Sequence, residues 1–147
     1  MRIEEVKVDE DGDYDFEGKV LGYETKIYAY MASGRLVKVQ AMLATPDEDC
    51  FRAYHQMVDL LTKKYGPPSR EGENYDSPYE RGDGYEQTAV RVGKAHITSI
   101  WFTDTDEADK GGLWITISKK LTVNVHYEGP HWAAELAQRQ SKSAGAF

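Results

Sequence analysis

Cysteine and long apolar segments are scarce in this chain of 147 residues, and each scarcity excludes a class of protein. A single cysteine, Cys50, excludes a disulfide within the chain and a cysteine-rich metal site. No apolar run approaches the ~20 residues that a membrane-spanning helix needs. Residues 1–5 are not followed by the apolar segment of a secretory leader. As it stands, the sequence therefore predicts a cytoplasmic protein, or an exported one if a leader has been removed.

Basic residues are too few and too scattered for a nucleic-acid surface. The chain has 18 Lys and Arg against 25 acidic residues, for a net charge of −7. Phosphate contacts dominate nucleic-acid affinity and need clustered basic side chains. Here only Lys63-Lys64 and Lys119-Lys120 are adjacent. The sequence predicts no nucleic-acid partner. An acidic chain is better matched to a basic partner, or its charge serves solubility alone.

Motifs for the common site chemistries are also missing. Aspartates at positions 9, 11, 13 and 15 have the spacing of a calcium loop, but Tyr14 stands where Gly is needed and Val20 where the bidentate Glu is needed. The histidines form no H-x-x-x-H pair, and no Gly-rich phosphate loop is present. Acids at 47–49 disfavour a reactive Cys50 thiolate, so a small buried side chain is predicted there. No metal, cofactor or catalytic residue is predicted.

What the sequence does contain is strand periodicity. Residues 21–31 and 37–43 alternate apolar and polar side chains on either side of the turn at 32–35, which predicts an antiparallel hairpin with one face in the core. A weaker signal at 3–8 precedes an Asp-Gly turn. Residues 96–103, 113–118 and 121–127 predict three further strands.

One helix, over residues 46–65, has signals at both ends. Thr45, Pro46 and Glu48 have the spacing of a capping box with proline at the first helical position. Gly66 suits the left-handed residue after a helix, and Pro67 prevents continuation. Between them an apolar stripe recurs at helical spacing: Phe51, Tyr54, Val58, Leu61 and Tyr65.

Together these elements predict an α+β fold with one domain over residues 1–140. A single antiparallel sheet of five or six strands carries the long helix on one face. Shorter helices are predicted near 84–93 and 131–140, although a strand competes for 84–93 because Val90 and Val92 alternate with Arg91. Residues 141–147 are expected to form a flexible tail.

Aromatic residues exceed what one core needs, with ten Tyr and three Trp. Tyr and Trp are enriched at recognition surfaces. Residues 69–85 show no sustained period and are longer than a connection needs, which predicts a loop. The expected binding residues are Tyr28, Tyr30 and Trp114 on the sheet and Tyr75, Tyr79 and Tyr85 in the loop. In the competing interpretation, other segments or a symmetry mate simply cover these side chains.

Several structural motifs resemble small uncharacterised bacterial α+β domains. The motifs are "GRLVKVQAML", a helix ending in "KYGPP", "SIWFTD" and "LTVNVHYEGP". In such domains a hairpin leads to a helix ending in Lys-Tyr-Gly-x-Pro, then to a Trp-bearing strand and a last strand. The resemblance covers about residues 34–127 and implies the same fold. It also implies export or lipid anchoring, which many members show, and it transfers no catalytic residue.

The predicted function is non-catalytic protein binding or a structural role, through the aromatic sheet face and the 69–85 loop. An inhibitor or immunity-type partner of a basic protein is compatible with the acidic composition. The alternative is a small hydrolase-like or ligand-binding enzyme that uses His96, His126 and acids of the 104–109 turn. A third possibility is a homo-oligomer that pairs through Tyr28, Tyr30 and Trp114.

Overall fold

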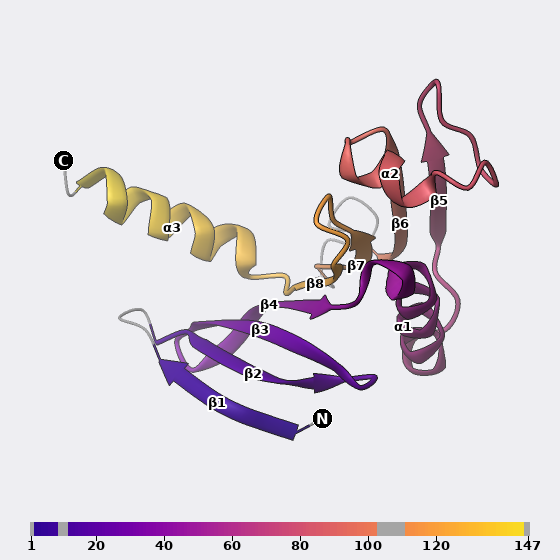
Figure 1. Cartoon of the computed structure of the whole chain (residues 1–147). Coiled ribbons are helices and arrows are strands. Elements are labelled where there is room, and N and C mark those ends of the chain that lie inside the picture. Colours follow the sequence, from indigo (N-terminus) through magenta and orange to yellow (C-terminus); the bar gives the residue numbers. More distant parts are fainter. Residues whose placement is uncertain (1, 9–11, 103–110, 146–147) are drawn as a thin grey trace.

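The chain builds one antiparallel sheet whose strand order is β1-β2-β3-β4-β8-β7-β6-β5, with helices packed on it (Figure 1). The computed structural model describes residues 2–8, 12–102 and 111–145, and describes side chains for 12–102 and 111–142. The strands are β1 (Arg2–Val8), β2 (Tyr14–Val20), β3 (Tyr23–Ala32), β4 (Arg35–Ala44), β5 (Arg70–Tyr75), β6 (Ala95–Phe102), β7 (Gly112–Ile117) and β8 (Val123–Glu128). The helices are η1 (Asp47–Asp49), α1 (Cys50–Tyr65), α2 (Glu86–Arg91) and α3 (Trp132–Gly145).

The predicted α+β class is confirmed, but the sheet has eight strands rather than five or six. One of the missed strands is β2. Leu21 and Gly22 both have positive φ, 54° and 83°, and turn β2 into β3. Such a turn is the natural connection of a two-residue hairpin, but leucine is uncommon in it. The sequence prediction therefore began a strand at Leu21, where the structure has a turn.

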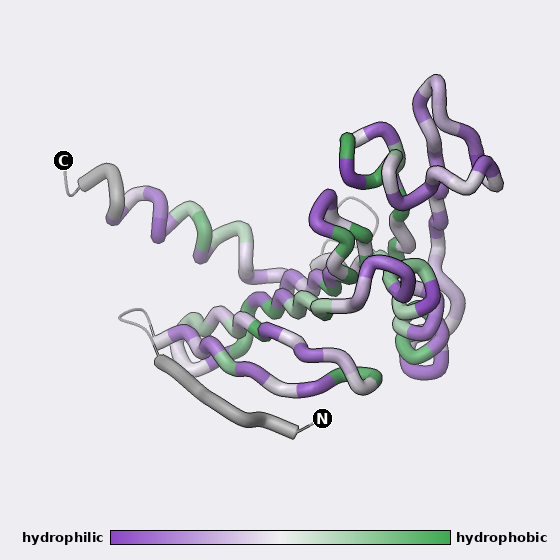
Figure 2. Tube along the Cα trace, viewed as in Figure 1, coloured by the Kyte–Doolittle hydropathy of each residue, from purple (hydrophilic) through white to green (hydrophobic). Residues whose placement is uncertain are grey.

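The second missed strand is β5, which corrects the prediction of a loop over residues 69–85. Residues Arg70–Tyr75 pair antiparallel with β6 along their whole length. Their sequence, REGENY, has low strand propensity, and β5 is hydrophilic along most of its length (Figure 2). Charge is common on a strand at the edge of a sheet because it discourages pairing with other chains. Only residues 76–85 form the connection to α2.

Helix α1 ends as predicted and begins differently. Gly66 adopts φ 82°, and its N–H donates to the carbonyl of Thr62. At the other end the prediction of a capping box is wrong, because residues 47–49 form a 3-10 turn without a side-chain cap. The Thr45 hydroxyl donates instead to the carbonyl of Leu121, at 3.3 Å, and so ties the end of β4 to the turn before β8.

The main core lies between α1 and strands β6, β7 and β8. Trp101 is buried there, and its indole N–H donates to the carbonyl of Gly66 at 2.8 Å. Cys50 is fully buried, as predicted, and burial raises the pKa of its thiol, with a smaller contribution from the charge of Asp49. The cluster also contains Leu43, Ala53, Tyr54, Met57, Val58, Ile97, Leu113, Ile115, Ile117, Leu121 and Val123.

Two shorter helices complete the described chain. Residues Glu86–Arg91 are helical, which resolves the helix-or-strand alternative, and Ala89 and Val90 are buried. Helix α3 confirms the prediction near 131–140 and continues to Gly145. It lies at the opposite end of the molecule from α1 (Figure 1). Among the described residues, no helix has the length and apolar character required to cross a membrane.

Candidate functional site

The predicted sheet aromatics lie on the face opposite the α1 core, called here the outer face. Ile115 and Val125 point into the core, whereas their neighbours Trp114 and His126 point to the outer face. Cross-strand pairing joins Trp114 to His126, His126 to Gln40 and Gln40 to Tyr28. Tyr28, Gln40, His126 and Trp114 therefore form one row across four strands, which we call the outer row. Each of the four residues is half-buried.

Two rings of the outer row are packed against each other. The Trp114 and His126 rings stack with centroids 5.1 Å apart and an interplanar angle of 13°. Burial lowers the pKa of His126, and the charge of Lys38 lowers it further. The imidazole is therefore neutral at physiological pH, which suits a packed aromatic surface better than an acid-base role.

Tyr30, also predicted as a binding residue, is engaged within the molecule. Its ring contacts Trp132 of α3 at a centroid distance of 5.3 Å. The ammonium of Lys38 lies 5.4 Å from the Tyr30 centroid and 4.7 Å from that of Trp132. Burial raises the pKa of the Tyr30 phenol. Tyr30 therefore helps to hold α3 and contributes little to an open surface.

A hollow of about 400 Å³ adjoins the outer row. Lys26 and Met42 pair across β3 and β4 in the next row along, and Glu17 pairs with Lys26. The lining residues are Glu17, Glu24, Thr25, Lys26, Met42, Ala44 and Thr122. The outer face thus presents an aromatic row beside a concave area of mixed charge.

The three tyrosines predicted in the loop fall into two groups. Tyr75 and Tyr79 are half-buried and pack against the main core. The Tyr75 hydroxyl donates to Glu73 at 2.9 Å, and burial is the largest of the effects that raise its pKa. Tyr85 is 63% exposed. Of the three, Tyr85 is the most open to a partner.

The residues of the enzyme alternative are not brought together. His96 and His126 both lie on the outer face, but β7 separates their strands. His96 stands four residues from Ile100, which shares the row of Trp114 and His126, so the offset along the strand is about 13 Å. His96 is exposed, with Asp76 4.0 Å from its Nε2. The acids of the 104–109 turn lie outside the described residues.

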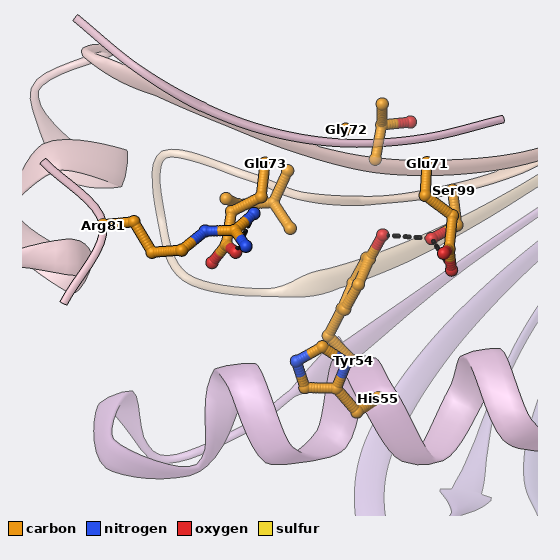
Figure 3. Close-up of a pocket in the computed structure, with 9 residues that line it drawn as sticks. Tyr54, His55, Glu71, Gly72, Glu73, Arg81 and Ser99 are labelled. Carbon is orange, nitrogen blue, oxygen red and sulfur yellow. Dashed lines mark hydrogen bonds and ion pairs between the residues drawn. The ribbon is translucent and has the colours of Figure 1, made fainter.

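A pocket that sequence reasoning missed lies between α1, β5 and β6 (Figure 3). Its volume is about 210 Å³. Tyr54 of α1 points toward Ser99 of β6, and the two buried hydroxyls are 2.5 Å apart. The Ser99 hydroxyl also lies 3.5 Å from a carboxylate oxygen of Glu71. His55, the next residue of α1, also lines the pocket. Its ring lies edge-on to that of Tyr54, with the ring centroids 5.4 Å apart.

Charged groups from β5 line the other side of this pocket. Glu73 accepts from the guanidinium of Arg81 at 2.7 Å.

Burial raises the pKa of Tyr54 to about 12; the hydrogen bond with Ser99 opposes the shift, and the charge of Glu71 adds to it. The Tyr54 phenol is therefore protonated at neutral pH and does not act as a base. In a strand, the spacing Glu71-x-Glu73 places both carboxylates on one face. The sequence predicted a loop over these residues, so their alignment was not expected.

A metal site is not assembled in the described part of the chain. No group of three or more His, Cys, Asp or Glu side chains there is arranged to hold a metal ion. Asp13, one of the four spaced aspartates, is held by Arg139.

No family model, curated protein or solved structure matches this chain. The likeness to small exported bacterial domains therefore stays a prediction.

Proposed function

We propose that this domain is a non-catalytic binding protein whose outer row docks against a basic protein partner. The observation that carries the proposal is the alignment of Tyr28, Gln40, His126 and Trp114 in one cross-strand row. All four keep part of their surface accessible, and a hollow of about 400 Å³ lies beside them. An aromatic strip with a neighbouring concavity offers a partner both a contact surface and a place to insert a side chain.

The arrangement suits protein recognition for two physical reasons. Trp and Tyr supply most of the binding energy at many interfaces because they bury large areas. The outer row also stands on paired strands, and the Trp114–His126 stack restrains both rings. A restrained side chain loses less conformational entropy on binding, so more of its contact energy is retained as affinity.

Charge favours a basic partner. The chain carries a net charge of −7, which attracts cationic proteins and repels a second copy of itself. Two of the lysines on the outer face are offset by acids: Lys19 lies 3.6 Å from Glu24, and Lys38 lies 3.7 Å from Glu128. Asp15 and Glu17 are exposed on β2 near one end of the outer row. Long-range attraction of this kind chiefly raises the association rate.

Of the binding residues predicted in the 69–85 segment, the proposal retains Tyr85. Tyr75 and Tyr79 pack inward, so their replacement would alter stability rather than a binding surface. Tyr85 precedes α2 and is the most exposed tyrosine of this segment.

The test compares two glutamine substitutions that add the same charge. Gln40→Arg places a cation in the middle of the outer row, and Gln138→Arg places one on the exposed side of α3. Proteins captured from the native host would be crosslinked, identified by mass spectrometry and bound again in purified form. We expect Gln40→Arg to weaken binding of a basic partner about tenfold or more, with Gln138→Arg close to wild type.

Other results would contradict the proposal. Crosslinks that avoid β3, β4, β7 and β8, or equal affinities for the two variants, would place the interface elsewhere. Sedimentation of the purified chain gives a second check. A concentration-dependent dimer that Gln40→Arg dissociates would replace the basic partner with the homo-oligomer alternative.

A further inference from the structure

We propose that the pocket between α1, β5 and β6 binds a small organic cation, a primary ammonium or a guanidinium, through Glu71. The pocket lies on the α1 side of the sheet and is independent of the outer row. Its lining combines two buried hydroxyls, two carboxylates and one guanidinium in about 210 Å³ (Figure 3). That volume accommodates on the order of seven water molecules, or an alkyl ammonium of comparable size.

The direction of the hydrogen bonds determines which kind of ligand fits. Ionised Glu71 can only accept, so the Ser99 hydroxyl donates to it. Ser99 has one hydroxyl proton, so the Tyr54 hydroxyl must donate to Ser99 across their 2.5 Å contact. Both hydroxyl protons are then used within the molecule. The lone pairs that remain on Tyr54, Ser99 and Glu71 are acceptors, so a ligand that contacts these three groups has to supply donors.

Arg81 shows that the pocket accepts such a group. This residue of the 76–85 connection places its guanidinium against Glu73, with 2.7 Å between nitrogen and oxygen. Glu73 also accepts from Tyr75, so its carboxylate is already well occupied. Glu71 lies two residues before Glu73 on the same face of β5. It has no ion-pair partner among the described residues. An external cation would repeat at Glu71 what Arg81 does at Glu73.

Charge balance points the same way. By formal charge, two carboxylates against one guanidinium leave the pocket lining at −1, histidine excluded. A monovalent cation neutralises it, whereas an anion meets an uncompensated carboxylate. Hydrogen bonds between an ammonium and a carboxylate are stronger than neutral ones, so N–H donors and positive charge together select the ligand.

The experiment is a titration of the full chain followed by the backbone amide signals in ¹⁵N-HSQC spectra. Butylammonium chloride is the probe, and tetramethylammonium chloride at equal ionic strength is the control cation without N–H donors. The variants are Glu71→Gln, which removes the open carboxylate, and Glu80→Gln, which removes an exposed acid of the same segment outside the pocket. Both replaced side chains are exposed, so neither change should prevent folding.

We expect saturable shifts at Gly72, Thr98 and Ser99 with butylammonium, about tenfold weaker binding in Glu71→Gln, and no change in Glu80→Gln. Equal shifts with tetramethylammonium would reduce the effect to general attraction and overturn the proposal, as would no saturation. A blocked Gly-Lys-Gly peptide separates the two sources of such a cation. If the peptide binds more tightly than butylammonium, the ligand is a lysine side chain of a protein. If it binds more weakly, the ligand is a free amine.

Discussion

Helices α1 and α3 are attached to the same sheet by different forces. Helix α1 buries Cys50, Ala53, Tyr54, Met57 and Val58 against the sheet. In the described side chains of α3, Trp132 is the one buried apolar residue. The remaining attachment of α3 is polar: Arg139 donates to Asp13 at 2.6 and 2.9 Å and to the carbonyl of Met31 at 3.1 Å.

The difference decides what each helix responds to. Burial of apolar area does not depend on protonation, so the α1 core is insensitive to moderate changes of pH. The α3 attachment depends on a charged pair with little access to solvent: the Asp13 side chain is 5% exposed and that of Arg139 is 19%. Removal of one partner leaves the other charge poorly solvated. The same sheet thus carries one helix held by apolar packing and one held by charge.

The largest predicted effect concerns the α1 core. Ile115→Ala removes a fully buried side chain from the centre of the sheet and should lower the free energy of unfolding by about 4 kcal/mol. Ile100→Ala, on the half-buried outer face, should cost about 1 kcal/mol. Urea denaturation of both variants measures the difference. Equal losses would mean that the two faces of the sheet contribute alike.

The second prediction concerns the charged attachment of α3. Arg139→Met should destabilise the protein by about 2 kcal/mol because Asp13 would lose its counter-charge in a buried position. The matched control is Lys142→Met, on the exposed surface of the same helix, where less than 0.5 kcal/mol is expected. Amide exchange of α3 should increase in Arg139→Met while that of α1 stays unchanged. Faster exchange in both helices would indicate one cooperative unit and contradict the distinction.

A smaller effect is expected from acid. The hydrogen bonds from Arg139 outweigh burial and hold the pKa of Asp13 below its usual range. The pair therefore contributes its full stability above the unfolded value, near pH 4, and loses it as the pH falls through the lowered native pKa. The stability difference between wild type and Asp13→Asn should shrink as the pH is reduced from 6 to 3. A difference that does not vary with pH would exclude this linkage.

The smallest predicted effect concerns the ammonium of Lys38, which lies above the aromatic pair and 3.7 Å from Glu128. Lys38→Met keeps the length of the side chain but removes the charge that lies over Tyr30 and Trp132, and should cost about 0.5–1 kcal/mol. Lys26→Met, on the neighbouring strand at the hollow, is the control and should be nearly neutral. Thermal denaturation of the two variants at low and high salt checks the result. A loss that grows with salt would contradict an electrostatic origin.

Local signals account for the parts of the fold that were predictable. The Gly66–Pro67 stop ends α1 at Tyr65 because glycine tolerates positive φ and proline cannot continue a helix. Alternation predicted β4 and the inward-facing Ile115 and Ile117. The capping box failed because Thr45 has a competing carbonyl, that of Leu121, which is 76 residues away in sequence.

The candidate site was predictable only in part. Tyr28, Tyr30 and Trp114 were expected on one sheet face, and strand alternation places them there. The sequence could not distinguish Tyr30, which Trp132 covers, from Tyr28. The pocket around Glu71 could not be predicted because the segment REGENY has no strand signal of its own. This segment becomes a strand by pairing with β6.

The sequence by itself determined the α+β class, the long helix and the side-chain alternation of the central strands. These depend on neighbours within a few residues, where periodicity, glycine and proline act directly. The tertiary structure decided the edge strand β5, the Asp13–Arg139 pair and the meeting of Tyr54, Ser99 and Glu71. Each of these joins residues at least 17 positions apart, and no local preference encodes such pairing. Their energy comes from hydrogen bonds and charges that exist only after the sheet has formed.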